Sequence, residues 1–262
     1  MDKIFAVANQ KGGVGKTTTS VNLAASLAVA KRRVLLVDMD PQGNATTGSG
    51  IDKYALKHSM YDLLTRKMQT LDVLIKNNES GYDLLPANGD LVAAEVELMS
   101  AIGRELRLRQ TLESVRDRYD VILIDCAPSL SVLTINALVA AQAVIIPMQC
   151  EYFALEGLAA LNQTIEQVAE GINPGLHISG ILRTMFDPRN TLSTDVSDEL
   201  QKHFPAQLFE TIIPRNIRLA EAPAHGKPAL HYDKTSRGSL AYLALAAEIL
   251  RKQNRAASTT AA

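Results

Sequence analysis

Short apolar runs alternate with longer stretches of helical periodicity along the whole chain. Several runs, such as VILID and AVIIPM, are apolar without alternation, which is typical of strands covered on both faces in a parallel sheet. We predict strands at Ile4–Ala8, Val34–Asp38, Tyr82–Pro86, Val121–Asp125, Ala143–Met148, His177–Leu182 and Leu208–Ile213. We predict helices at Thr17–Lys31, Glu95–Val115, Leu130–Ala141, Leu155–Glu170, Thr194–His203 and Ser239–Lys252. This order predicts an α/β fold: a doubly wound, mostly parallel sheet with helices on both faces.

The absence of linkers and of internal repeats indicates the domain organisation. No segment rich in Gly, Pro or Ser divides the chain, and no repeat of fixed period occurs. We therefore predict one domain over residues 1–253. Residues 254–262 are small and polar and carry no apolar face, so we expect them to form a frayed tail.

The composition narrows the function classes without selecting one. The 262 residues include 27 Lys and Arg against 28 Asp and Glu, a net charge of −1, and two cysteines. Two cysteines exclude a disulfide framework and indicate a reducing compartment, the cytoplasm. No apolar run approaches the length of about 18 residues that suggests a membrane-spanning helix. A near-neutral chain is also poorly suited to coating nucleic acid by bulk charge.

The most informative segment follows the first predicted strand and reads NQKGGVGKTT, residues 9–18. Its glycines let backbone N–H groups curl around an anion, and the helix that follows adds the positive end of its dipole. The strict Walker A pattern has glycine at the position of Gln10, so this loop is a variant form distinguished by Lys11. We expect Lys16 to reach the β- and γ-phosphates of ATP and the Thr17 hydroxyl to hold Mg²⁺. The predicted phosphate-binding residues are Lys11, Gly12, Gly13, Val14, Gly15, Lys16, Thr17 and Thr18.

Carboxylates end two of the predicted strands at the edge of the sheet where this loop lies. Asp38 and Asp40 follow one strand, and Asp125 ends another. Because ligands of open α/β sheets collect at the carboxyl ends of strands, we predict a metal site made of Thr17, Asp38 and Asp125, the last as a Walker B acid acting through water. Of Asp38 and Asp40, one could support the metal while the other orients a water for attack on the γ-phosphate. The alternative for Asp40 is a turn residue before Pro41.

Three further features are assigned to structure rather than to a site. Cys126 and Cys150 show no Cys-x-x-Cys spacing, so we expect buried small hydrophobic residues and not iron–sulfur ligands. The five histidines show no metal-ligand spacing, so we predict no zinc site. Tyr152 and Phe153 could stack on a base, but an aromatic pair at a helix start is more often part of the core.

Five sequence blocks carry a family resemblance: KGGVGKTT, VLLVDMDPQGNAT, YDVILIDCAPSL, QCEYFALEGL and IPRNIRLAEAPAHGKP. Together they closely resemble the ParA/Soj-type chromosome- or plasmid-partitioning ATPases, P-loop proteins of the deviant Walker A type. The likeness runs from about residue 3 to 250. The P-loop features alone indicate only the wider superfamily, whereas the last two blocks are specific to the partitioning branch.

The resemblance implies roles for the residues of the phosphate site. Lys11 matches the signature lysine that crosses a dimer interface to the partner subunit's phosphates, so that two ATP molecules lie between two subunits. Asp40 matches the hydrolysis-linked aspartate of the family. Thr17 and Asp125 match its magnesium-site residues. The implied catalytic set is therefore Lys11, Lys16 and Asp40.

The resemblance also implies contacts outside the phosphate loop. Pro214 and Asn216 fall in the segment that lines the adenine pocket, and Glu151 matches a dimer-face residue near the ribose. The ATP-bound dimer of the family binds double-stranded DNA without sequence preference, through basic residues that Arg189 and Arg218 match. The alternative for each arginine is a solvated side chain or a local ion pair. The implied partners are a second copy of the chain, which joins on ATP binding, and a stimulating ParB/Spo0J-like protein. The implied location is cytoplasmic and nucleoid-associated.

Other function classes remain open at this stage. A MinD-like division-site ATPase would end in a basic amphipathic helix that lies on a membrane, whereas the final residues AASTTAA hold no large apolar side chain, so we expect no membrane binding. An ATP-dependent ligase or kinase would need a substrate pocket rich in acid–base groups and would not need Lys11. Within the partitioning class, the cargo could be a chromosome, a plasmid or another large assembly. The charge of −1 fits DNA binding if the contact surface is assembled only when ATP pairs two subunits.

Overall fold

A seven-stranded sheet in the order β3-β4-β2-β5-β1-β6-β7 forms the framework of the molecule. The computed structural model describes residues 2–77 and 79–260, and for residues 77 and 256–260 it describes the backbone only. The strands are β1 (Ile4–Val7), β2 (Val34–Met39), β3 (Ile75–Asn77), β4 (Tyr82–Leu85), β5 (Val121–Cys126), β6 (Ala143–Gln149) and β7 (His177–Thr184). All neighbouring pairs are parallel except β3 and β4, which are antiparallel.

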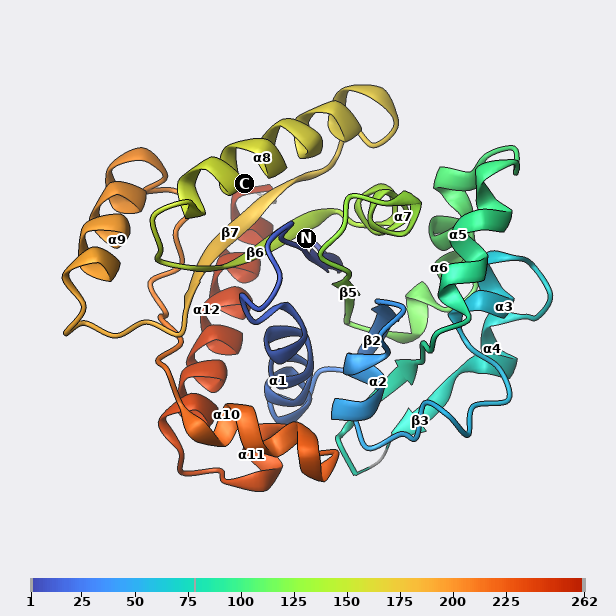
Figure 1. The fold of residues 1–262 in the computed structure, drawn as a ribbon, viewed down its shortest axis with the longest axis horizontal. Coiled ribbons are helices and arrows are strands. Elements are labelled where there is room, and N and C mark those ends of the chain that lie inside the picture. The colour runs from blue at the N-terminus through green and yellow to red at the C-terminus, as the bar shows by residue number, and fades with distance from the viewer. Residues whose placement is uncertain (1, 78, 261–262) are drawn as a thin grey trace.

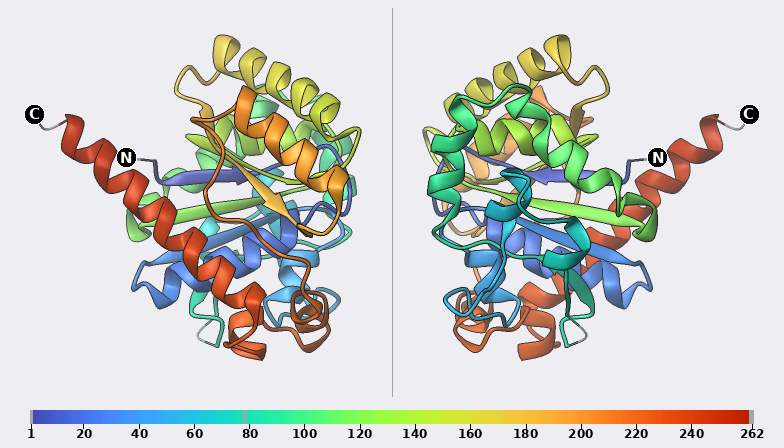
Figure 2. Two further views of the ribbon diagram at one scale, coloured as in Figure 1. Left: turned by 90° about the vertical axis from the view of Figure 1, so that its left-hand side faces the viewer. Right: turned by 90° about the vertical axis from the view of Figure 1, so that its right-hand side faces the viewer.

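Helices cover both faces of this sheet, as the edge-on views of Figure 2 show. One face carries α1 (Lys16–Val29), α2 (Asn44–Gly48), α10 (Ile217–Glu221), α11 (Ala229–Tyr232) and α12 (Arg237–Thr260). The other carries α3 (Met60–Leu64), α4 (Thr70–Val73), α5 (Leu91–Met99), α6 (Arg107–Glu113), α7 (Val132–Ala140), α8 (Ala154–Gly171) and α9 (Thr191–His203). Short 3₁₀ turns lie at Arg104–Leu106, Arg116–Arg118 and Ala222–His225. The predicted fold class is confirmed (Figure 1).

The absence of alternation in the central strands has a direct structural cause. In β5, Ile122 and Ile124 point into the core under α7, while Val121 and Leu123 point into the core under α1. All four side chains are buried. Successive side chains of a strand alternate between faces, so a strand covered on both sides needs an apolar residue at every position. No helix in the described part of the chain is both long and apolar enough to cross a membrane.

The predicted strand at Leu208–Ile213 is wrong. This segment pairs with the sheet only in places: isolated bridges beside β7 lie at Leu208 and at Pro214, which follows the segment, and the Ile213 N–H donates to the Arg183 carbonyl at 2.9 Å. The backbone N–H groups of Glu210 and Thr211 donate instead to the buried carboxylate of Glu248 on α12, both at 2.9 Å. The Glu248 side chain therefore accepts the hydrogen bonds that these two N–H groups would donate to a neighbouring strand if the segment continued as a strand.

The predicted helix at Glu95–Val115 is also wrong as a single element. The chain forms α5, which ends at Met99, and then a 3₁₀ turn and α6 in its place; Gly103, directly before the 3₁₀ turn, has a left-handed conformation (φ 64°) that a continuous right-handed helix cannot contain. The edge strand β3 was missed because three residues are too few to show a period.

The last helix runs farther than we predicted. Its backbone continues to Thr260, so residues 254–260, expected to be frayed, are helical; residues 261–262 lie outside the described part. The Gln253 side chain donates to the carbonyl of Asp2 at 2.8 Å, which ties this helix to the N-terminal segment. The two alanines that follow Arg255 favour continuation of the helix.

Candidate nucleotide-binding site

The glycine loop between β1 and α1 is held in a shape that only glycines accept easily. Gly13 (φ 74°) and Gly15 (φ 87°) both adopt left-handed conformations. Helix α1 begins directly after them at Lys16, whose Nζ donates to the carbonyl of Lys11 at 3.0 Å. Burial lowers the pKa of the Lys16 ammonium, although the Asp125 carboxylate opposes this shift. The loop therefore closes around one buried cation at a helix N-terminus, the arrangement that suits a phosphate.

Buried carboxylates lie next to this loop at the ends of β2 and β5. Asp125 accepts hydrogen bonds from Thr17 Oγ1 and Ser20 Oγ, both at 2.8 Å. Asp38 is its direct neighbour in the parallel register, and neither residue is exposed to solvent. Burial raises the pKa of both carboxyl groups, and their mutual repulsion adds to the shift of Asp125. A cation beside Thr17 would relieve this repulsion, so the residues present fit a magnesium site.

The carboxylates of Asp38 and Asp40 serve different purposes. Asp38 accepts from the backbone N–H of Thr46 at 2.8 Å, from Thr46 Oγ1 at 2.7 Å and from the backbone N–H of Asp40 at 3.1 Å. These bonds turn it towards α2, and it does not line the cavity beside the loop. Asp40 lines that cavity, and its Oδ1 accepts from the backbone N–H of Gln42 at 2.9 Å. Asp38 therefore fixes the position of Asp40.

The cavity beside the loop has a volume of about 480 Å³. Most of the predicted nucleotide-binding residues line it: Gly12, Gly13, Gly15, Lys16, Thr17, Thr18, Pro214 and Asn216. Asn216 also caps α10, because its Oδ1 accepts from the backbone N–H of Arg218 at 3.0 Å. Val14 is buried beneath the loop, and its carbonyl accepts from Thr184 Oγ1 at 2.8 Å. The structure thus brings together a glycine loop and a segment 200 residues later in the chain.

Sequence reasoning missed several lining residues, among them Thr184, Met185, Leu219 and Tyr242. They come from β7, its end, α10 and α12, and none belongs to a motif with a chemical rationale. Met185 has a left-handed backbone (φ 50°), unusual for a non-glycine residue, and no sequence signal reveals it.

Lys11 points away from the cavity of its own chain. Its Nζ forms an ion pair with Glu151, in which each side chain is 43% exposed, and neither residue lines the cavity. Tyr152 and Phe153 follow Glu151 and are 74% and 69% exposed, so their predicted place in the core is wrong. They lie in the turn before α8, where their rings pack edge to face on each other with centroids 5.0 Å apart.

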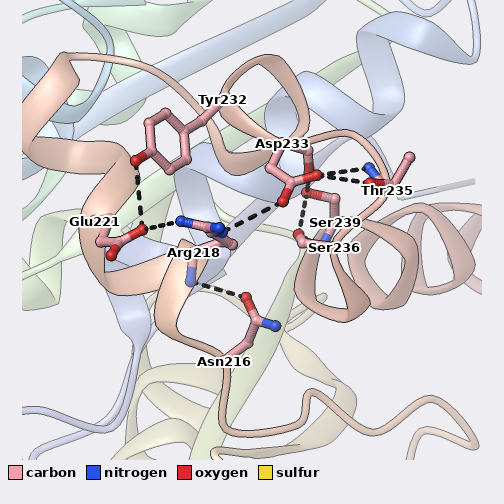
Figure 3. Close-up of polar contacts among 8 residues, drawn as sticks. All are labelled: Asn216, Arg218, Glu221, Tyr232, Asp233, Thr235, Ser236 and Ser239. Atoms are coloured by element: carbon pink, nitrogen blue, oxygen red, sulfur yellow. Dashed lines mark hydrogen bonds and ion pairs between the residues drawn. The ribbon is translucent and has the colours of Figure 1, made fainter.

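The predicted DNA-binding arginines lie outside this cavity, and both are engaged by acids. Arg189 is 88% exposed and donates through Nε and Nη2 to the two carboxylate oxygens of Asp187, at 2.9 and 2.7 Å. Figure 3 shows Arg218 between two acids: its Nη1 lies 2.8 Å from Glu221 Oε2 and its Nε 3.4 Å from Asp233 Oδ2. Local ion pairs, the alternative for both arginines, are therefore present in this conformation.

The cysteines behave as predicted. Cys126 and Cys150 are free thiols, and both side chains are buried. Burial raises the pKa of the Cys150 thiol to about 11, which keeps it protonated and unreactive near neutral pH.

Comparisons with known proteins identify the family. The protein-family model described as "AAA domain" matches residues 2–178. The sporulation initiation inhibitor protein Soj of Bacillus subtilis is 51% identical over 95% of this chain and 98% of its own length. The chromosome partitioning protein ParA of Caulobacter vibrioides is 48% identical over 96% of this chain and 95% of its own length. The chain belongs to the Soj/ParA family of chromosome-partitioning ATPases.

A solved structure extends this Soj/ParA likeness to three dimensions. It is described as cobyrinic acid a,c-diamide synthase from Mycobacterium smegmatis with bound ADP and magnesium. It is 38% identical, superposes with a TM-score of 0.85 and matches over 97% of this chain and 96% of its own. In that protein the shared fold holds ADP and magnesium.

Proposed function

We propose that this Soj/ParA-family chain is an ATP-driven switch. ATP pairs two subunits, the dimer binds double-stranded DNA without sequence preference, and hydrolysis, stimulated by a ParB/Spo0J-like protein, releases the DNA. The names of its relatives, chromosome partitioning protein and chromosome-partitioning ATPase, support ATP hydrolysis in the service of partitioning. The chain would then work in the cytoplasm on the nucleoid.

The cavity residues suit a nucleotide with Mg²⁺. Backbone N–H groups of the loop and Lys16 Nζ bind the phosphates, while the Thr17 hydroxyl holds the ion and Asp125 supports it through water. When bound, the ion supplies positive charge against the phosphates and the buried carboxylates. We assign Asp38 to positioning, because its oxygens already accept bonds from Thr46 and Asp40. The ADP and magnesium in the M. smegmatis structure support a nucleotide with Mg²⁺ as the ligand of this cavity.

Hydrolysis needs a positioned water, and Asp40 is the carboxylate that faces the cavity. A water held by Asp40 attacks the γ-phosphorus: its oxygen bonds to phosphorus and its proton passes to the Asp40 carboxylate, while the bond to the β–γ bridging oxygen breaks and ADP leaves. Asp38 keeps Asp40 in place through its backbone N–H. Pro214 and Asn216, which also line the cavity, are the adenine contacts of this proposal.

One observation carries the two-subunit mechanism: Lys11 points out of the phosphate cavity of its own chain. Its cation sits on an exposed face with Glu151 and the aromatic pair that follows it. A lysine held outside its own cavity can serve the phosphates of a second subunit. Exposed aromatic rings beside it supply apolar area that a partner would bury. Glu151 belongs to the same face, where we propose its ribose contact.

DNA binding requires cations that can exchange partners. Arg189 and Arg218 are both exposed, and their acidic partners hold them in ion pairs that solvent weakens. Phosphates can replace those partners once two copies of the surface face one duplex. With a net charge of −1, the chain needs this doubling to hold DNA.

A second candidate function comes from the M. smegmatis protein, whose description is that of an amide-forming synthase. Such an enzyme uses ATP to activate a carboxyl group and needs a bound second substrate. The higher identity to Soj and ParA favours partitioning. ATP turnover without any small-molecule substrate would separate the two functions.

The decisive experiment compares the wild type with Asp40→Ala and Asp40→Asn. We expect both variants to bind ATP with near-normal affinity and to hydrolyse it at least ~100-fold more slowly, since a positioned general-base group contributes about 10² to 10⁴. Asp40→Ala should stay on DNA of random sequence after the wild type has been released. Normal turnover in Asp40→Ala would remove Asp40 from the mechanism, and turnover only with an added carboxylic acid substrate would favour the synthase.

A further inference from the structure

A lysine that belongs to no assigned site holds the turn that carries Asp40. Lys53 lies half-buried in the loop after α2, and its Nζ donates to the backbone carbonyl of Gln42 at 2.6 Å. Gln42 lines the nucleotide cavity two residues after Asp40. No carboxylate within the described residues pairs with the Lys53 ammonium, whose other neighbour is the exposed ring of Tyr54, with its centroid 5.4 Å away. The main contact of this cation is therefore the Asp40 turn and not a surface ion pair.

Gln42 connects this lysine to the Asp40 carboxylate. The Gln42 N–H donates to Asp40 Oδ1 at 2.9 Å, and the Gly43 N–H donates to the Asp40 carbonyl at 2.9 Å. Gln42 is thus bonded to Asp40 through its N–H and to Lys53 through its carbonyl. Because one residue makes both bonds, a rotation of the Gln42 backbone that moves its carbonyl also moves the N–H that orients the Asp40 carboxylate.

No backbone group within the described residues donates to the carbonyl that Lys53 holds. The Thr46 N–H, four residues after Gln42, would be the helical donor, but it donates to Asp38 Oδ2 at 2.8 Å. The stem of Lys53 adds a packing contact, because a Cβ placed on the left-handed Gly43 (φ 59°) would lie 3.0 Å from Lys53 Cδ. The lysine therefore supports the end of this turn with both its ammonium and its stem.

The loop after α2 has a fixed course that returns Lys53 to the Asp40 turn. The chain reverses at Gly50 (φ 83°), and the Ile51 N–H donates back to the Thr46 carbonyl at 3.2 Å. Asp52 fixes the next residues, because its Oδ1 accepts from the backbone N–H two residues farther on at 2.9 Å. Backbone hydrogen bonds therefore hold the loop on both sides of Lys53, so that its ammonium reaches Gln42 from a set position.

We propose that Lys53 is a positioning residue for ATP hydrolysis, which holds the Asp40 carboxylate in place through the Gln42 backbone. This inference rests on the proposed function and adds a residue to it. Hydrogen bonds from an ionised donor are about twice as strong as those between neutral groups, so the ammonium suits this task. Lys53 does not line the nucleotide cavity, so its loss should slow hydrolysis and leave ATP binding unchanged. A shift of about 1 Å in a reacting group can cost about 10²-fold in rate, and since Asp40 keeps its other bonds we expect a loss of about 10-fold.

The test measures ATP hydrolysis by the wild type, Lys53→Met, Lys53→Arg and Lys57→Met, without a stimulating partner. Methionine keeps the stem that packs on Gly43 and removes the ammonium, whereas arginine keeps the charge and a donor. Lys57 is exposed in the same loop, so Lys57→Met is a control with the same change of net charge. We expect kcat to fall about 10-fold in Lys53→Met with KM within about 2-fold of the wild type, which marks an effect on the hydrolysis step. Lys53→Arg should recover most of the lost rate, and Lys57→Met should match the wild type.

A double-mutant cycle tests whether Lys53 acts through Asp40. In the Asp40→Asn background, Lys53→Met should change the single-turnover rate by less than about 2-fold, because the group that it positions is already gone. A wild-type rate in Lys53→Met, an equal 10-fold loss in the Asp40→Asn background, or no recovery in Lys53→Arg overturns the positioning role alone.

Binding of a fluorescent ATP analogue checks that Lys53→Met remains folded and loaded. Loss of this binding in Lys53→Met but not in Lys57→Met would show a purely structural lysine and would also overturn the positioning role. A normal hydrolysis rate in Asp40→Asn overturns the proposed role of Asp40 itself, whatever the Lys53 variants do. The two failures are therefore distinguishable.

Discussion

Replacing Thr46 by valine removes one hydroxyl from a fully buried position beside the nucleotide cavity. This hydroxyl donates to Asp38 Oδ2 at 2.7 Å and accepts from the backbone N–H of Ala87 at 2.9 Å. It therefore joins α2, the end of β2 and the segment after β4 through two hydrogen bonds. Valine has nearly the same shape as threonine, so Thr46→Val removes the two bonds and leaves the packing in place.

The expected loss of stability follows from these two bonds. Losing one charge-assisted bond to the buried carboxylate costs about 1.5 kcal/mol, because Asp38 keeps two backbone N–H donors. Leaving the Ala87 N–H unpaired adds about 1.5 kcal/mol, for a total of about 3 kcal/mol. In a chain of this size that lowers the Tm by about 9 °C. Hydrolysis should fall further than ATP binding, because Asp38 also holds the backbone of Asp40.

The assay is thermal unfolding of the nucleotide-free chain followed by circular dichroism, with Thr46→Ser as the matched control. Serine keeps the hydroxyl and loses one methyl group, a change that costs about 1 kcal/mol. Thr46→Val should therefore melt below Thr46→Ser. If Thr46→Val is as stable as Thr46→Ser or more stable, the two hydrogen bonds of the Thr46 hydroxyl do not stabilise the contact between α2, the end of β2 and the segment after β4.

Three further predictions concern core packing, the pH dependence of stability and the role of Lys16 in ATP binding. Gly180→Ala places a methyl group 2.4 Å from the buried ring of Phe209 and should cost about 2 kcal/mol in urea unfolding. Asp120, whose ion pair with Arg33 lowers the pKa of its carboxyl to about 2, stabilises the fold above its ordinary pKa. The urea-stability difference between wild type and Asp120→Asn should thus be constant above about pH 5 and shrink as the pH falls from about 4 towards 2. Lys16→Gln should abolish binding of a fluorescent ATP analogue, whereas retained binding would show that the buried amine is dispensable.

The fold could be predicted wherever a segment carried its own signal. The central strands are covered on both faces and therefore read as apolar runs, so their positions along the chain and their mostly parallel pairing could be predicted from the sequence. Leu208–Ile213 has the same apolar character, but the carboxylate of Glu248, 35 residues or more away, takes its backbone donors. Such a contact leaves no trace in local periodicity.

In the candidate site, too, the residues of a local motif could be predicted and the contacts between distant segments could not. The phosphate loop is local, so its glycines and Lys16 were recognisable from spacing. The separate tasks of Asp38 and Asp40 could not be told apart, because they depend on Thr46 reaching back from α2. The pairing of Lys11 with Glu151 joins residues 140 positions apart, and neither the local sequence pattern nor the family resemblance predicted it.

The central claim is that ATP joins two subunits and that Lys11 completes the site of the partner. The most direct measurement is the solution mass of Asp40→Ala, with and without the added Lys11→Ala substitution, in Mg-ATP and in Mg-ADP. The account predicts twice the chain mass for Asp40→Ala in Mg-ATP, and the single-chain mass in Mg-ADP. Asp40→Ala/Lys11→Ala should show the single-chain mass in both nucleotides. A dimer of that double variant in Mg-ATP, or a single-chain mass for Asp40→Ala in Mg-ATP, would contradict the account.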